Sequence, residues 1–181
     1  IIYGSAKIAA YYRKQLNIPQ FAMNQVSKAS EARDGACSII NVVGEDTAIE
    51  PGKSTQVAGK AAFIALEQAT LDLRNGDIDA LVTAPINKDN IQSDTFTFPG
   101  HTEYLEAALG EGNKALMILC NENVRVALVT THLPLAQIPS AITKEAIVEK
   151  LEAFNTSLKN DFGIDHPRIA VLWLNPHAGE N

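Results

Sequence analysis

Hydrophobic positions with helical spacing predict four helices along the chain. In residues 55–75, small and apolar side chains recur every three or four positions and so share one face, and Gly76 follows at the place of a C-terminal cap. A face of such small residues lets a helix approach its neighbour closely. Thr143 can cap a second long helix, which runs to about Asp161. Shorter helices are predicted at 4–16 and 102–109.

Continuous apolar runs predict the strands. They cover residues 39–43, 80–83, 115–119, 124–131 and 169–174. Runs of this kind, separated by amphipathic helices, are typical of a sheet covered by helices on both faces. The sequence therefore predicts an α/β fold with a mixed, mostly parallel sheet. The runs 115–119 and 124–131 are close enough to form an antiparallel pair, and Trp173, inside the last run, is expected in the core.

The composition is that of an ordinary globular protein and limits the partners to consider. The chain has 181 residues, of which 46% are hydrophobic and 20% charged, so it can bury a core. A formal net charge of −6 argues against a surface for nucleic acid or for anionic membranes, although one pocket can still be positive. No apolar run reaches the ~18 residues of a membrane span, so none is predicted.

The two cysteines indicate the compartment. Cys37 and Cys120 each lie near an apolar run, and their spacing matches no pair motif. We interpret them as two buried thiols in a reducing environment. The protein is therefore expected in the cytoplasm.

Polar, reactive residues gather in the loops after the predicted strands. Lys88, His132 and His177 each come shortly after one of the apolar runs. In open α/β sheets, ligands bind outside the carboxyl ends of the strands. The sequence therefore predicts one site built from three loops that are far apart along the chain.

His132 and His177 are candidate metal ligands. Each is followed or preceded within two residues by a proline, which stiffens its loop. Neutral imidazoles bind divalent metals well, but two ligands are too few for a catalytic zinc, which usually takes three from the protein. The alternative is that each imidazole only hydrogen-bonds a loop carbonyl.

A second candidate site lies at the start of the helix predicted at 102–109. Gly100, His101 and Thr102 stand where the backbone N–H groups of a helix start can bind phosphate or carboxylate, and the His101 and Thr102 side chains can add donors. Lys88 could pair with the same kind of anion. The alternatives are an ordinary capped helix with an exposed histidine, and a solvated loop lysine.

The chain lacks the glycine fingerprint of the common dinucleotide-binding fold and the phosphate loop of nucleoside triphosphatases. Residue patterns alone therefore stop at an α/β, enzyme-like chain with an anionic small ligand and a two-histidine metal site.

Four motifs in order resemble the 4-hydroxythreonine-4-phosphate dehydrogenase family. They are Leu81-Val82-Thr83-Ala84-Pro85-Ile86-Asn87-Lys88, Phe98-Pro99-Gly100-His101-Thr102-Glu103, Val129-Thr130-Thr131-His132-Leu133-Pro134-Leu135 and Leu174-Asn175-Pro176-His177-Ala178-Gly179-Glu180. The family's fold is similar to that of isocitrate and isopropylmalate dehydrogenases, which bind NAD without the glycine fingerprint.

The resemblance implies a reaction and residue roles. NAD, or NADP, oxidises 4-phosphooxy-threonine (4-hydroxy-L-threonine phosphate) with help from a divalent metal, and decarboxylation then yields 3-amino-2-oxopropyl phosphate for pyridoxal phosphate synthesis. By the same resemblance, His132 and His177 are metal ligands, and His101 and Thr102 contact substrate. Zinc, magnesium, manganese and cobalt all stay open as the metal, and no residue is assigned as the general base.

The resemblance also implies a larger protein. The family forms a homodimer whose site is shared between subunits, with a third metal histidine and basic substrate-binding residues far downstream. Residues 1–181 are therefore expected to be the front and middle portion of a two-lobed dehydrogenase, without its glycine-rich opening segment and its C-terminal part. Such a chain by itself should be inactive.

Three other functions stay open. A related enzyme of the same fold could act on D-threonate or D-erythronate 4-phosphate. A two-histidine metallohydrolase would activate water, with Glu103 or Glu180 as the base, and would not need NAD. A non-catalytic module is the third alternative for the isolated chain.

Overall fold

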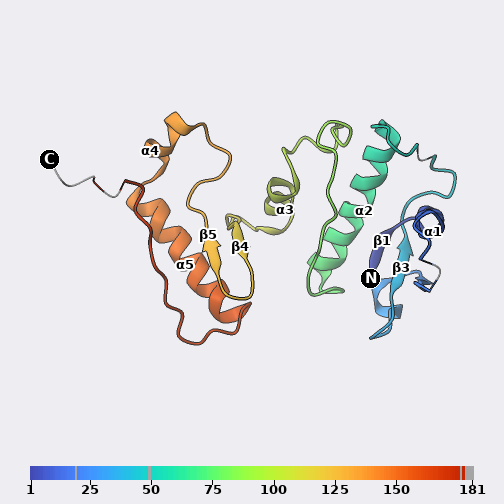
Figure 1. The fold of residues 1–181 in the computed structure, drawn as a ribbon, viewed down its shortest axis with the longest axis horizontal. Helices are drawn as coiled ribbons and strands as arrows, with labels where there is room; N and C mark the ends of the chain where they lie inside the picture. The colour runs from blue at the N-terminus through green and yellow to red at the C-terminus, as the bar shows by residue number, and fades with distance from the viewer. Residues whose placement is uncertain (19, 49, 176, 178–181) are drawn as a thin grey trace. The chain divides into compact units, whose positions relative to one another are not determined.

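The computed structural model describes residues 1–18, 20–48, 50–175 and 177 (Figure 1). The chain divides into two compact units, Ile1–Lys114 and Ala115–Asn181. Each unit has its own strands and helices, and each is described separately below.

A parallel three-stranded sheet organises the first unit. Its order is β1 (Ile2–Gly4), β3 (Ser38–Asn41) and β2 (Asn24–Val26), with Tyr3 opposite Ile40. The central strand β3 is the most buried because it has a neighbour on each edge. Between β1 and β2 runs α1 (Ala6–Gln15), whose first turn is capped by the Ser5 hydroxyl at 3.3 Å from the Ile8 nitrogen. A short 3₁₀ turn, η1 (Ala29–Glu31), precedes β3.

The long helix α2 (Gln56–Asn75) confirms the predicted 55–75 helix and its signals at both ends. The Thr55 hydroxyl accepts from the Ala58 N–H at 3.2 Å. Gly76 ends the helix with a φ of 77°, in the left-handed region of the backbone. A glycine adopts this conformation at the lowest energetic cost because it has no Cβ. None of the helices in the described residues is long and apolar enough to cross a membrane.

Aromatic residues form the core of the first unit beside α2. Phe63 and Leu66 of α2 pack with Ile91, Phe96 and Tyr104. Most residues of the segment 86–100 are polar or charged, yet Phe96 in this segment is fully buried, at 0% exposure. The segment is therefore part of the core, and it holds the start of the next helix, α3 (His101–Leu109), against α2.

The second unit combines a hairpin with a helix. Strand β4 (Ile118–Cys120) pairs antiparallel with β5 (Arg125–Ala127), as the short spacing of the two runs allowed. The Asn121 side chain accepts two backbone N–H bonds at 2.9 Å and so closes the turn. After η2 (Leu135–Gln137) and α4 (Ile138–Ala141), α5 (Lys144–Asn160) starts at its predicted cap, where the Thr143 hydroxyl accepts from the Ala146 N–H at 3.1 Å.

Two predicted strands are wrong within the described residues. Segments 80–83 and 169–174 are in no strand, and Val82 is 95% exposed. A strand forms only where a neighbouring backbone supplies hydrogen-bond partners, and no strand of the described chain pairs with either segment. For the same reason Trp173 is 76% exposed rather than in the core, and the strand predicted at 124–131 shortens to β5.

The cysteine prediction is corrected in part. Both thiols are free, as expected, but Cys37 is only partly buried and Cys120, at the end of β4, is exposed. Cys120 closes a two-stranded hairpin, and both faces of such a small sheet stay near solvent. The prediction of free thiols therefore agrees with the structure, and the prediction that both are buried is wrong.

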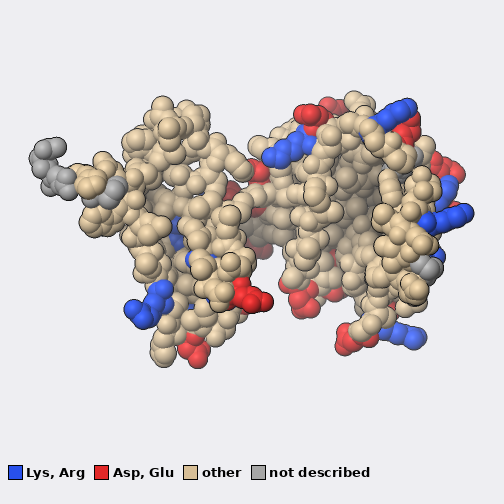
Figure 2. Space-filling model, in the orientation of Figure 1, with Lys and Arg blue, Asp and Glu red and all other residues tan. Residues whose placement is uncertain are grey.

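Lys and Arg side chains are mixed with Asp and Glu side chains on the face drawn in Figure 2. They form no single basic patch on that face, in keeping with the net charge of −6.

Candidate functional site

His101 and Thr102 are the first two residues of α3 and are both partly buried. Gly100 is the N-cap residue, and its carbonyl accepts from the Tyr104 N–H at 3.3 Å. The first N–H groups of a helix have no acceptor inside it, so they are available to an anion. Burial lowers the pKa of His101 below its ordinary value, which favours the neutral imidazole near neutral pH.

The Lys88 side chain reaches the start of α3. A Cβ placed on Gly100 would lie 4.0 Å from the Lys88 Nζ and 3.5 Å from the Glu103 Oε2. The structure therefore brings a cation and a carboxylate that are fifteen positions apart along the chain close to Gly100, the residue just before His101. The predicted strand before Lys88 is absent. The sequence placed Lys88 and His101 in two separate candidate sites, and the structure brings them close together.

The Gln92 side chain closes the loop between Lys88 and Gly100. Its Nε2 donates to the Lys88 carbonyl at 3.2 Å and to the Phe98 carbonyl at 3.0 Å. At the start of the loop, the Asn87 Oδ1 accepts from two backbone N–H groups, those of Asp89 and Asn90, at 3.0 and 3.1 Å. The loop ends are thus tied to each other by side chains, and sequence reasoning missed Gln92.

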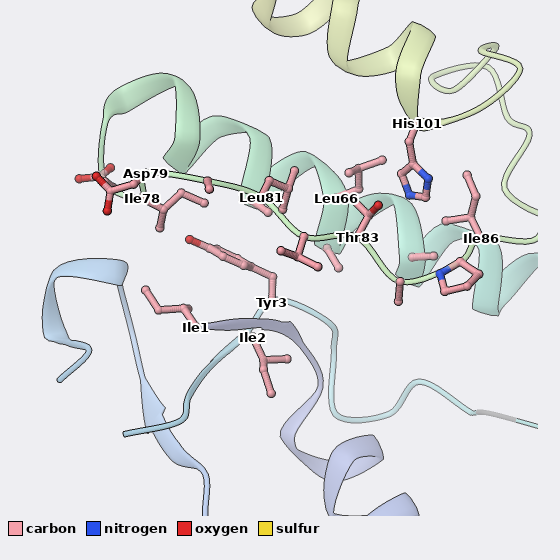
Figure 3. A pocket seen from close by; sticks show the side chains of 18 residues that line it. Ile1, Ile2, Tyr3, Leu66, Ile78, Asp79, Leu81, Thr83, Ile86 and His101 are labelled. Carbon is pink, nitrogen blue, oxygen red and sulfur yellow. The ribbon is translucent and has the colours of Figure 1, made fainter. Parts of the chain in front are cut away.

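A cavity of about 730 Å³ lies beside this loop, between β1, α2 and the segment 77–86 (Figure 3). Ala62, Ala65 and Ala69, from the small-residue face of α2, line one wall together with Leu66. The His101 ring reaches one end of the cavity, near Ile86, and Asp79 lies toward the other end. His101 is thus the candidate site residue that borders this cavity.

Tyr3 and Asp72 join the cavity wall on β1 to α2. The Tyr3 hydroxyl donates to Asp72 Oδ2 at 2.6 Å, and Gln68 Nε2 donates to the other carboxylate oxygen at 2.8 Å. Burial, followed by the bond to the carboxylate, raises the pKa of Tyr3 well above its ordinary value. Sequence reasoning missed this group, although Gln68 and Asp72 stand four positions apart on one helix face, where such pairs interact.

His132 and His177 both belong to the second unit and are exposed. His132 lies in the loop beyond β5 with a φ of 51°, a left-handed conformation that is uncommon for a residue with a Cβ. The His177 N–H donates to the Asn175 side chain at 3.2 Å. Pro176 and Ala178 to Glu180 of the His177 motif lie outside the described residues, so Glu180 as a base is not placed.

The two histidines are the right kind of donor for a divalent metal but do not complete a site. Among residues 1–18, 20–48, 50–175 and 177, no three His, Cys, Asp or Glu side chains gather as a ligand group. Imidazole nitrogen suits zinc, cobalt and related ions, which take three or more protein ligands in catalytic sites. Any metal bound by His132 and His177 therefore needs a further ligand from elsewhere.

The parallel sheet, its packed helices and the polar loop beside a cavity define an α/β protein of the kind that binds a small ligand. The family described as "Pyridoxal phosphate biosynthetic protein PdxA" matches residues 1–181, and the chain belongs to this family.

Curated relatives support the same family. The chain is 56% identical over 180 residues to a 4-hydroxythreonine-4-phosphate dehydrogenase of Bacteroides thetaiotaomicron, a match that covers 99% of this chain and 49% of the relative. The protein of the same name from Sulfurihydrogenibium is 38% identical over 181 residues, covering 100% of this chain and 55% of the relative. The chain thus spans about half the length of the curated relatives it matches.

Solved structures show the same fold. A 4-hydroxythreonine-4-phosphate dehydrogenase from Klebsiella pneumoniae matches with a TM-score of 0.84 and 29% identity, covering 98% of this chain and 54% of that chain. The corresponding structure from Burkholderia phymatum has a TM-score of 0.82 and 31% identity over 98% of this chain and 54% of that chain. The predicted α/β class is confirmed by these neighbours.

Proposed function

We propose that the protein containing this chain is a 4-hydroxythreonine-4-phosphate dehydrogenase. It oxidises 4-phosphooxy-threonine with NAD or NADP and a divalent metal, and releases carbon dioxide and 3-amino-2-oxopropyl phosphate for pyridoxal phosphate synthesis. The observation that carries the proposal is the 56% identity to the Bacteroides enzyme over 99% of this chain. Since the chain spans about half of that relative, the activity is proposed for the whole protein. We also propose that the protein acts in the cytoplasm.

In this proposal His101 and Thr102 bind the substrate. Both stand in the first turn of α3, where backbone N–H groups are available to a phosphate or carboxylate. The lowered pKa of His101 keeps the imidazole neutral, so it can donate one hydrogen bond and accept another without adding charge. The Thr102 hydroxyl adds a further donor.

His132 and His177 are proposed as two ligands of the divalent metal. Their ring nitrogens would hold the ion, and a third ligand would come from a part of the protein beyond residues 1–181, in a homodimer whose site is shared between subunits. When bound, such an ion makes a coordinated hydroxyl more acidic and stabilises negative charge that develops on oxygen. Of the candidate metals, the two imidazole ligands favour zinc or cobalt over magnesium and manganese, which prefer oxygen ligands.

The bond changes balance without any further reactant. NAD or NADP would accept the hydride from C3 of the substrate, and a base would take the proton of the C3 hydroxyl. The resulting β-keto acid then loses its carboxylate as carbon dioxide, and the carbon that carried it takes up a proton. No described residue is assigned as the base.

The test uses the full-length protein with 4-hydroxythreonine phosphate and NAD, and follows reduced nicotinamide by its near-ultraviolet absorbance. Absorbance should rise, stop after metal is removed with a chelator, and return when a divalent metal is added. A rise only with D-threonate or D-erythronate 4-phosphate would assign the protein to that alternative. Release of inorganic phosphate without NAD reduction would favour the hydrolase and contradict the dehydrogenase.

A further inference from the structure

Lys88 is the cation nearest to the proposed substrate contacts in the loop before α3. Its Nζ lies 4.0 Å from the position of a Cβ on Gly100, the residue before His101. Lys88 is exposed, and among the described residues its ammonium takes part in no ion pair. The Glu103 carboxylate lies near the same position, with its Oε2 3.5 Å from that Cβ, but it forms no ion pair with Lys88. The charge of Lys88 is therefore available to a ligand at the position where His101 and Thr102 begin their helix.

The backbone of Lys88 is held in place, unlike that of a free surface lysine. Gln92 Nε2 bridges the Lys88 carbonyl, at 3.2 Å, and the Phe98 carbonyl, at 3.0 Å. On the far side of this bridge, Phe98 packs edge to face against Phe96 and Tyr104, with ring centroids 5.6 and 5.5 Å away. The Lys88 carbonyl is thus tied to a segment that is anchored in the aromatic core.

The same bridge sets the separation between Lys88 and His101. Phe98 and Gly100 are two positions apart, and Tyr104 of α3 belongs to the core cluster that fixes Phe98. Loss of the Gln92 amide would release the Lys88 carbonyl while the aromatic core stays packed. The position of the Lys88 ammonium would then vary, and that of His101 would not.

We propose that Lys88 is a further substrate-binding residue whose ammonium contacts an anionic group of the substrate held by His101 and Thr102, and that Gln92 is its positioning residue. The inference rests on the proposed function, because the substrate is the phosphorylated amino acid named there. A point charge on a flexible stem is suited to a phosphate or a carboxylate, and it discriminates against an uncharged analogue.

The test compares four variants of the full-length protein in the NAD assay. Lys88→Met should raise the KM for 4-hydroxythreonine phosphate about tenfold to a hundredfold, the loss expected for a hydrogen bond to a charged group, and leave the KM for NAD unchanged. Lys88→Arg should restore most of the affinity. Gln92→Met, of similar size but without the amide, should raise the same KM about threefold to tenfold with little change in kcat. Lys60→Met, an exposed lysine of α2, is the matched control and should behave as the wild type.

Inhibition by two simple anions identifies the group that Lys88 contacts. If the group is phosphate, Lys88→Met weakens inhibition by inorganic phosphate; if it is the carboxylate, the variant weakens inhibition by unphosphorylated 4-hydroxythreonine. An unchanged substrate KM in Lys88→Met, with both inhibitors binding as in the wild type, overturns the inference.

The outcome separates this inference from the proposed function. If the wild type reduces no NAD with this substrate, the proposed function fails. The Lys88 inference is then decided by calorimetric binding of inorganic phosphate and of 4-hydroxythreonine to the full-length wild type and Lys88→Met: weaker binding of either anion by the variant supports it, and equal or undetectable binding overturns it. Thermal unfolding of each variant checks its fold, and Lys88→Gln replaces Lys88→Met if the latter does not fold.

Discussion

Gly59 of α2 lies directly against the backbone of Asn90, so close that a Cβ on Gly59 would overlap the Asn90 carbonyl oxygen. The contact places the loop that carries Lys88 on the surface of α2. It also explains why a residue of poor helix propensity is the fourth residue after the Thr55 cap, where a glycine costs about 1 kcal/mol relative to alanine. Close approach of two backbones outweighs that cost.

The Gly59–Asn90 contact predicts the effect of one added methyl group. Gly59→Ala should lower the free energy of unfolding by about 1–3 kcal/mol, the usual range for overpacking, because the backbone of Asn90 and Ile91 must move away. Denaturant unfolding of the full-length protein measures it. Gly4→Ala is the control, since a Cβ there meets no atom within 4 Å. A Gly59→Ala protein as stable as the control would contradict the contact.

The bond from Tyr3 to Asp72 predicts a loss of stability in Tyr3→Phe. Removal of the hydroxyl leaves the buried Asp72 carboxylate with the Gln68 bond alone, so the free energy of unfolding should fall by about 1–3 kcal/mol at neutral pH. Tyr12→Phe, an exposed tyrosine of α1 at 39% exposure, should change it little. Chemical unfolding of both variants at neutral pH decides the point.

The same bond predicts that the stabilisation by Tyr3 depends on pH in the alkaline range. The pKa of Tyr3 is raised in the folded protein, so the unfolded chain loses the phenolic proton first, at about pH 10. The contribution of Tyr3 is therefore complete below that pH and declines above it. The difference in unfolding free energy between wild type and Tyr3→Phe should narrow above about pH 10. A constant difference would show that Tyr3 ionises alike in both states.

The burial of His101 predicts that the free energy of unfolding changes in the opposite direction, with a loss of stability at acidic pH. Its pKa is lowered by burial in the folded protein, so below about pH 6.5 the unfolded chain binds a proton more readily than the folded one. Stability should therefore fall as the pH decreases through this range, and His101→Gln should reduce that fall. Unfolding from pH 7.5 to 5.5 measures it, with His166→Gln, an exposed turn residue, as the control. An NMR titration midpoint of His101 at or above 6.5 would argue against the burial.

Metal content tests His132 and His177 separately from catalysis. In the full-length protein, replacement of either residue by alanine should weaken metal binding at least a hundredfold, since loss of even an outer-sphere partner of a ligand costs about 10–100-fold. Elemental analysis after dialysis reports the bound metal. His166→Ala serves as the comparison. Full metal occupancy in both the His132→Ala and His177→Ala proteins would remove the two residues from the proposed metal site.

The sequence alone determined the features that depend on neighbours along the chain. The hydroxyls of Thr55 and Thr143 cap α2 and α5 as predicted, and Gly76 ends α2 in the left-handed conformation. Each cap is formed by groups within a few positions of one another, so local residue patterns are sufficient to predict it. Residue patterns also predicted the α/β class, and the motifs identified the family.

Only the tertiary structure decided which distant groups meet. The apolar segments 80–83 and 169–174 are in no strand of the described chain, because a strand depends on partners that its own residues do not specify. Phe96, in a segment of polar composition, is fully buried because residues of α2 and α3 surround it. Lys88 and His101 appeared in the sequence as two separate candidates. They lie together because the Gln92 amide and the aromatic core fold the loop between them, and such contacts exist only once the chain is packed.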